Sequence, residues 1–95
     1  MDERDREKIG GSLDFLANNT AWSEGLSHLL VYNGVFSTRM MADIKQSLDP
    51  ARTMYQRACK RGPKAFEGLV QSLIQSNNLV PAQRIKPELQ SLPQM

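Results

Sequence analysis

The sequence predicts an all-α protein of six short antiparallel helices joined by brief turns, and three observations favour this class. Apolar residues recur at helical spacing along the chain, and no segment has the alternating pattern of a strand. Turn and capping residues, such as Asn33-Gly34 and Asp49-Pro50, separate these stretches at short intervals. The length of 95 residues suits a single domain with one compact core.

The first helix is expected over residues 2–18. Its apolar face consists of Ile9, Leu13 and Leu16. Gly10-Gly11 interrupts this helix, and paired glycines inside a helix indicate a bend. Asp2 and Glu3 suit its start, where the helix macrodipole favours anions.

The second and third helices are placed by their capping residues. Thr20 is the predicted N-cap of the second helix, which ends at Asn33-Gly34. Ser37 is the predicted N-cap of the third. The apolar positions of the second helix are Trp22, Leu26, Leu29 and Leu30. Those of the third are Met40, Met41, Ile44 and Leu48.

Asp49-Pro50 begins the fourth helix, because it combines a capping residue with a first-turn proline. Its inward positions are Ala51, Met54, Tyr55 and Ala58. Its outward face holds Arg52, Arg57, Lys60 and Arg61. Gly62 is expected to close this helix in the left-handed conformation, and Pro63 to open the fifth. The sequence therefore predicts a rigid, charged corner between two closely packed helices.

The fifth helix carries the clearest apolar stripe and ends near Asn77-Asn78. Its members are Phe66, Leu69, Val70, Leu73 and Ile74. A short sixth helix, with Pro81 in its first turn, is expected to close the core. Its apolar residues are Leu79, Val80, Ala82 and Ile85. Beyond it, Pro87, Pro93 and their polar neighbours indicate a tail or linker, so the predicted domain covers residues 1–88 and the tail residues 89–95.

The distribution of charge is more informative than the net charge of +2. Between Arg39 and Lys64 the sequence has seven cations, opposed only by Asp43 and Asp49. Such an imbalance is usually a solvated face, and its alternative is an electrostatic contact surface.

The chain is expected to act in the cytoplasm. Its single cysteine, Cys59, cannot form an internal disulfide, which favours a reduced intracellular protein. Residues 1–8 carry charges of both signs and do not look like a secretory signal. No apolar run approaches the roughly 18–20 residues needed to span a bilayer, so no membrane role is expected.

No pattern for catalysis, a cofactor or a metal is found. The segment around Cys59 superficially resembles the cysteine-protease signature Gln-Ala-Cys-Arg-Gly, but it departs at the first position and inserts a residue before the glycine. It also lies in a predicted helix, and the only histidine, His28, is predicted to lie in the middle of a helix. One Cys and one His cannot make an ordinary zinc site, and no Gly-rich phosphate motif occurs.

A basic helical bundle can also bind nucleic acid by inserting a helix into a groove. Against this interpretation, the basic positions of the fourth helix alternate with apolar positions that the core needs. Few Asn, Gln or Arg residues have the spacing of a base-reading helix. Nucleic-acid binding therefore remains the more remote alternative.

Several segments, taken in order, resemble a caspase recruitment domain, or CARD, of the death-fold superfamily. They are residues 1–6, Gly34-Val35-Phe36-Ser37, Met41-Ala42-Asp43-Ile44 and Arg61-Gly62-Pro63-Lys64-Ala65-Phe66. The similarity extends over residues 2–89, and the glycine-interrupted first helix matches the bent first helix typical of CARDs. The chain looks closest to the CARD prodomain of an initiator caspase, of the Dronc type, or to the CARD of a caspase adaptor.

The resemblance implies partner-binding residues on two faces. In CARDs, a basic face from helices one and four commonly contacts an acidic face from helices two and three. The corresponding basic candidates here are Arg6, Lys8, Arg52, Arg57, Lys60 and Arg61. The acidic candidates are Glu24 and Asp43. One departure is that the middle of helix one, often basic in initiator caspases, is here the uncharged stretch at residues 9–13.

The implied function is recruitment without catalysis. As a prodomain, the chain would bring an initiator caspase zymogen to the CARD of an apoptosome-type scaffold for proximity activation in apoptosis. The alternative is the CARD of an adaptor or regulatory protein that binds a caspase. Either role implies CARD partners and permits self-assembly, with no nucleic acid or membrane involved.

Overall fold

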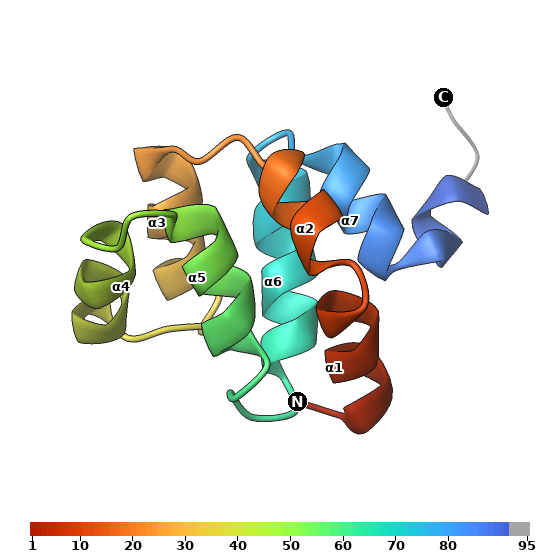
Figure 1. The fold of residues 1–95 in the computed structure, drawn as a ribbon, viewed down its shortest axis with the longest axis horizontal. Coiled ribbons are helices and arrows are strands. Elements are labelled where there is room, and N and C mark those ends of the chain that lie inside the picture. Colours follow the sequence, from red (N-terminus) through yellow and green to blue (C-terminus); the bar gives the residue numbers. More distant parts are fainter. Residues whose placement is uncertain (92–95) are drawn as a thin grey trace.

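The computed structural model of the protein describes residues 1–91, which contain seven α-helices, a final 3-10 helix and no strand. The helices surround α6, which crosses the middle of the molecule (Figure 1). The elements are α1 (Glu3–Gly10), α2 (Leu13–Asn18), α3 (Glu24–Tyr32), α4 (Thr38–Lys45), α5 (Pro50–Ala58), α6 (Ala65–Gln75), α7 (Leu79–Ile85) and η1 (Pro87–Ser91). The Cα radius of gyration is 12.3 Å, close to that of a compact chain of this size. The all-α class predicted from the sequence is confirmed.

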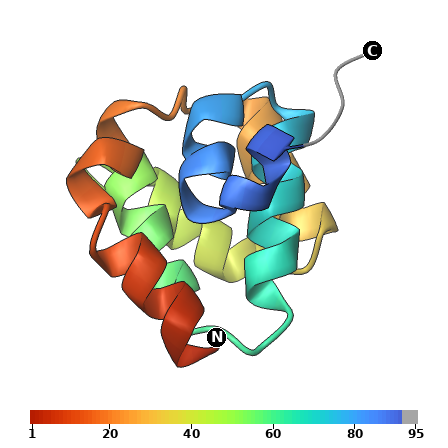
Figure 2. The ribbon, with the colours of Figure 1, turned by 90° about the vertical axis from the view of Figure 1, so that its right-hand side faces the viewer.

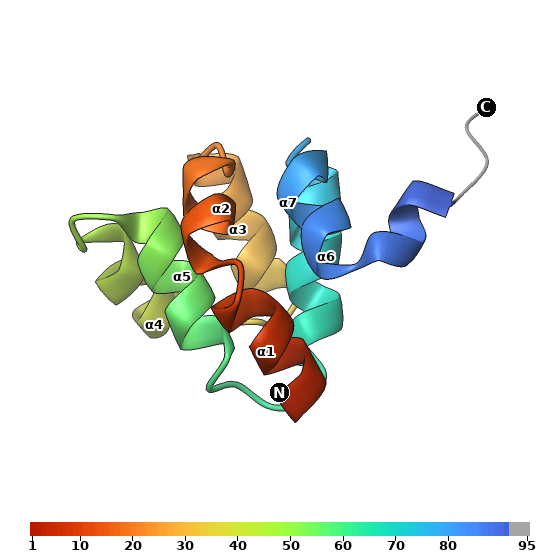
Figure 3. The same ribbon diagram turned by 45° about the vertical axis from the view of Figure 1, so that its right-hand side comes forward.

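The first predicted helix is two helices, so seven helices occupy the six predicted spans. Gly11 and Ser12 separate α1 from α2, and the two helices run in different directions (Figure 3). Ser12 has φ −125° and ψ 19°, which are not helical values, and the helix is interrupted there. The bend expected at Gly10-Gly11 is therefore a complete break at Gly11-Ser12.

Side-chain caps determine where four of the helices begin. Asp2, Ser23, Ser37 and Asp49 each accept a hydrogen bond from a backbone N–H in the first turn. The predicted caps Ser37 and Asp49 are confirmed, and Pro50 occupies the first turn of α5. The predicted cap Thr20 is wrong, because its hydroxyl donates back to the carbonyl oxygen of Leu16 and α3 begins only after Ser23. Trp22 consequently precedes α3 instead of belonging to it.

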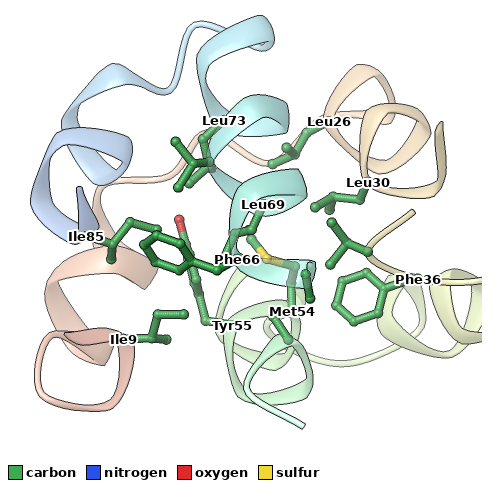
Figure 4. Close-up of a cluster of buried hydrophobic side chains, with 14 of the residues drawn as sticks. Ile9, Leu26, Leu30, Phe36, Met54, Tyr55, Phe66, Leu69, Leu73 and Ile85 are labelled. Carbon is green, nitrogen blue, oxygen red and sulfur yellow. The ribbon is translucent and has the colours of Figure 1, made fainter. Parts of the chain in front are cut away.

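The core is assembled around the apolar face of α6. Figure 4 shows Phe66, Leu69 and Leu73 of α6 among buried side chains from the surrounding helices. The other helices contribute Ile9, Leu16, Leu26, Leu30, Met41, Ile44, Met54, Tyr55, Ala58, Ala82 and Ile85. The last helix, α7, packs against α1, α2 and α6 and closes this side of the core (Figure 2). The predicted apolar stripes are confirmed at these positions.

Three apolar residues predicted to face the core are exposed instead. Leu48 lies in the turn after α4, which ends at Lys45, and its exposed fraction is 106%. Leu79 and Val80 occupy the start of α7 and are 50% and 54% exposed. Leu48 is exposed because α4 ends before it, so the apolar pattern extends beyond the helix. Leu79 and Val80 are exposed because Pro81, Ala82 and Ile85 are the residues of α7 that face the core.

The backbone conformation of the turns agrees only in part with the conformations predicted from the sequence. Gly34 has φ +76° just after α3, and its neighbour Val35 donates to the carbonyl oxygen of Leu30, which ends the helix as predicted. Asn77, just after α6, has a similar positive φ of 65°. Gly62 is not in the left-handed region, so that prediction is wrong. The helix α5 instead ends at Ala58, several residues earlier.

Buried polar groups connect segments that are far apart in the sequence. The Tyr55 hydroxyl lies 2.6 Å from Thr20 Oγ1, whose own proton goes to the Leu16 carbonyl oxygen, so Tyr55 is the donor. Burial raises the pKa of Tyr55 to about 12, and the phenol stays neutral. The buried side chain of Asn78 accepts from Ala21 N at 2.8 Å and thereby holds the loop before α3 against the start of α7.

Gly68 of α6 permits a close approach of the backbone that follows α3. A Cβ atom at this position would lie 2.7 Å from the backbone oxygen of Asn33 and 2.9 Å from Val35 Cγ2. The Asn33 amide also donates to Ser72 Oγ at 2.9 Å and to Gln75 Oε1 at 3.0 Å. The end of α3 is therefore held tightly along α6.

We expect Gly68→Ala to lower the free energy of unfolding by about 1–3 kcal/mol, because the added methyl group collides with a backbone oxygen that cannot rotate away. This loss outweighs the gain of about 1 kcal/mol from replacing glycine in a helix. Urea denaturation of both variants measures the effect. The matched control is Gly62→Ala, where an added Cβ has open space and should change little. Equal stability of Gly68→Ala and the parent would contradict the close approach.

The C-terminal end of the described chain returns to the core at one point. Leu89, in η1, packs against the core cluster, and Lys86 N–H donates to the Ala82 carbonyl oxygen at 2.9 Å. Most of the predicted tail at residues 89–95, including Pro93, lies outside the described residues.

Candidate functional site

Arg52, the central basic candidate, is bound by two carboxylates. Its Nη1 lies 2.7 Å from Asp14 Oδ1 of α2, and its Nε lies 3.5 Å from Asp49 Oδ2. The hydrogen bond to Asp14 raises the pKa of Arg52 above its ordinary value. These neighbours offset much of the Arg52 charge, so the surface of α5 is less basic here than the sequence alone indicated.

Three cations that form no ion pair among the described residues lie beyond Arg52, at the end of α5 and in the turn that follows. Arg57, Lys60 and Lys64 are exposed and form no ion pair within residues 1–91; together we call them the basic corner. Arg61 is different, because its Nε donates to the Val35 carbonyl oxygen at 2.9 Å. Lys60 and Arg61 both follow α5 rather than lying on its outward face, since the helix ends at Ala58. Arg61 is therefore partly structural.

The first helix supplies a further cation near the basic corner. The N-terminal amino group, just before α1, donates to the carbonyl oxygen of Arg61, which places the start of α1 beside the turn after α5. Burial raises the pKa of the Cys59 thiol at the end of α5, and the positive charge of Arg6, exposed on α1, opposes this rise. Lys8 points to another neighbour: its Nζ lies 5.7 Å from the centre of the Phe66 ring and 4.0 Å from Asp5 Oδ1. The structure thus places Arg6 near the end of α5, whereas Lys8 contacts Phe66 and Asp5.

The two acidic candidates also have different surroundings. Glu24, in the first turn of α3, has its Oε2 2.9 Å from Lys45 Nζ of α4, so its charge is locally balanced. Asp43 is exposed on α4 and has no ion-pair partner among the residues that the structure describes. Asp43 is accordingly the better acidic contact.

A shallow groove between α3 and α4 was not anticipated from the sequence. Its volume is about 340 Å³, and the Glu24–Lys45 ion pair lies at its edge. The lining residues are Glu24, Ser27, His28, Val31, Thr38, Met41, Ala42 and Lys45. The sequence could not predict this groove, or the ion pairs of Arg52 and Glu24, because each joins helices whose mutual placement depends on packing.

Cys59 and His28 are on separate parts of the fold. Burial raises the pKa of the half-buried Cys59 thiol at the end of α5, whereas His28 is exposed on α3 beside the groove. No group of three or more His, Cys, Asp or Glu side chains within the described residues is placed to hold a metal ion. None of the helices described is long and apolar enough to cross a lipid bilayer.

Comparison with known proteins returns no relative. No family model matches the chain, and neither a curated protein nor a solved structure matches it.

Proposed function

We propose that this chain is a caspase recruitment domain, with the six-helix antiparallel death fold and the bent first helix of that family. It would recruit an initiator caspase zymogen to the CARD of an apoptosome-type adaptor scaffold in the cytoplasm. The domain itself would be non-catalytic. Its contribution to apoptosis would be to raise the local concentration of the attached protease so that the protease can activate.

The observation that carries this proposal is the break between α1 and α2 in an otherwise short-helix, all-α chain. The resemblance of the sequence to CARDs implies a bent first helix at this position. Five further helices follow it, in spans close to those expected from the apolar periodicity, and this all-α arrangement supports the proposal. A core centred on α6, with caps at Ser37 and Asp49, further supports a rigid domain that presents fixed faces.

The charge distribution supports a contact between unlike faces. The basic corner and the nearby Arg6 offer unpaired cations, and Asp43 offers an unpaired carboxylate on α4 within the described residues. Two different, complementary patches on one rigid body allow head-to-tail association that need not close. Such charged contacts control specificity and association rate more than affinity. Each contact would be weak alone, and assembly on a scaffold would add avidity.

A binding titration tests the proposal. The domain is titrated against the CARD of an apoptosome scaffold, the CARD of an initiator caspase, and duplex DNA, each at two salt concentrations. We expect binding to the scaffold CARD and no micromolar binding to DNA. Salt dependence alone does not separate these partners, because both contacts are charged.

Each other outcome of the titration identifies a different function. Binding to the caspase CARD, but not to the scaffold CARD, would assign the chain to an adaptor or regulatory protein. Micromolar DNA binding without any CARD binding would contradict the proposal and favour the basic nucleic-acid-binding alternative. The full-length gene product also separates caspase from adaptor, since a caspase carries a downstream protease domain.

A further inference from the structure

The helix α1 is attached to the rest of the molecule by few side chains. Of the eight residues in Glu3–Gly10, only Ile9 is buried. Figure 4 shows Ile9 beside Phe66 of α6 and Ile85 of α7. The Lys8 ammonium group adds a contact with the Phe66 ring at 5.7 Å. Ile9 is therefore the one apolar anchor within α1. A second attachment lies just before the helix, where Met1 packs against the core cluster and its amino group donates to the carbonyl oxygen of Arg61.

The break after α1 depends on the backbone of one residue. Gly10 belongs to α1, and Gly11, with φ −72° and ψ −12°, remains in the right-handed helical region. Only Ser12 departs, with φ −125° and ψ 19°. Rotation of Ser12 to helical dihedrals, near −63° and −42°, would join α1 and α2 into one helix over residues 3–18.

A joined helix would change which surface is covered. Ile9, Leu13 and Leu16 would then share one face, because they are spaced at i, i+4 and i+7. Ile9 would leave its pocket beside Phe66 and Ile85, and that apolar pocket would be open. The straight form thus presents a detached helix and an empty site of matching shape.

We propose that a second copy of this chain fills this pocket, so that two chains exchange α1 in a domain-swapped dimer. A second copy fits the pocket because it has the same α1 sequence. The pocket already holds Ile9 of its own chain, and Ile9 of another copy would fill it in the same way. Exchange of an identical element costs little, since the packing that each chain gives up internally is restored by its partner. Each chain would contain one continuous helix in place of α1 and α2. This inference does not depend on the proposed CARD function.

Arg84 favours the bent, monomeric form. Its Nε lies 3.2 Å from Ser12 Oγ, and its guanidinium lies 4.6 Å from the centre of the Phe15 ring. These contacts tie α7 to the break itself. The balance between the two forms should therefore respond to substitutions at Ser12.

The pair Ser12→Ala and Ser12→Gly isolates the backbone effect. Both variants lose the hydroxyl contact with Arg84, so they differ only in helix propensity at residue 12. Alanine favours the straight helix in both chains of a dimer, and we expect its dimer Kd to be roughly 30-fold lower than that of the glycine variant, or about 2 kcal/mol. Gly10→Ala is the control, since residue 10 is helical in both forms and the Kd should not change.

Sedimentation equilibrium on the full chain, up to about 1 mM after prolonged incubation, measures these Kd values. In a mixture of isotope-labelled and unlabelled Ser12→Ala chains, the dimer should give intermolecular NMR contacts between Ile9 and Phe66. A Ser12→Ala protein that stays monomeric would overturn the proposal. So would equal Kd values for the two variants, or a dimer without intermolecular Ile9–Phe66 contacts. None of these outcomes alters the result of the CARD titration.

Discussion

Phe66→Ala should lower the free energy of unfolding by roughly 3–5 kcal/mol. Phe66 is only 9% exposed and belongs to the central core cluster on α6. Truncation removes its apolar contacts and leaves a cavity, because neighbouring side chains such as Ile9 and Leu69 can relax only in part. The loss is a large share of the total stability of about 5–15 kcal/mol typical of a domain.

Urea and thermal denaturation of Phe66→Ala measure this effect, with Leu48→Ala as the matched control. Leu48 is an apolar residue with an exposed fraction of 106%, so its truncation should change stability by no more than about 0.5 kcal/mol. If the two variants were equally stable, the core would not be centred on α6. The contrast also tests the correction to the predicted third helix, in which Leu48 was expected to face inward.

Charge reversal should have the largest effect on partner binding. If the domain binds a CARD through basic and acidic faces, Arg57→Glu and Asp43→Arg should each weaken that binding by several kcal/mol, or roughly 100-fold or more in Kd. The reason is that attraction across a desolvated contact becomes repulsion between like charges. Both side chains are exposed, so each variant should fold like the parent, which a thermal melt checks.

Arg57 is a cleaner probe of the basic face than Arg52. A glutamate at residue 52 would face Asp14 and Asp49 and would disturb the contact between α2 and α5 as well as any partner contact. Arg52→Glu is therefore expected to weaken CARD association together with some loss of stability. This revises the view from the sequence that Arg52 simply points outward.

Two further variants make the charge-reversal result specific. Glu88→Arg changes charge by the same amount as Asp43→Arg, but Glu88 lies on η1, outside α4, α5 and the turn from Lys60 to Lys64, and this variant should leave the Kd unchanged. If Arg57→Glu and Asp43→Arg both bind like the parent, the model of a basic and an acidic face is wrong for this protein. Lys64→Glu then asks whether the turn from Lys60 to Lys64 makes the contact instead.

Local chain chemistry was enough to predict the helical class, most helix positions and much of the core. Ser37 and Asp49 cap helices because their side chains satisfy backbone N–H groups within the same turn. The stripe on α6 becomes buried because its spacing places those residues on one face of any helix that they form. These interactions involve residues close together in the sequence, so they can be inferred without the fold.

The errors occur where a distant segment outweighs a local preference. Thr20 looks like a helix cap, but its hydroxyl instead contacts Leu16 and Tyr55. Leu79 and Val80 fit an apolar pattern, yet α7 turns Pro81, Ala82 and Ile85 inward. Gly62 suits a left-handed turn, although α5 has already ended at Ala58. In each case packing between helices decides which of several acceptable local arrangements occurs.

The charged surfaces also depend partly on the sequence alone and partly on the fold. The sequence alone established that cations outnumber carboxylates between Arg39 and Lys64, since charge depends only on residue type. Only the tertiary structure decided which of these charges remain unpaired. It placed Asp14 against Arg52 and Lys45 against Glu24, and it left Arg57 and Asp43 exposed. Coulombic attraction acts over a few ångströms in space, and the fold, not the distance along the chain, brings such charges together.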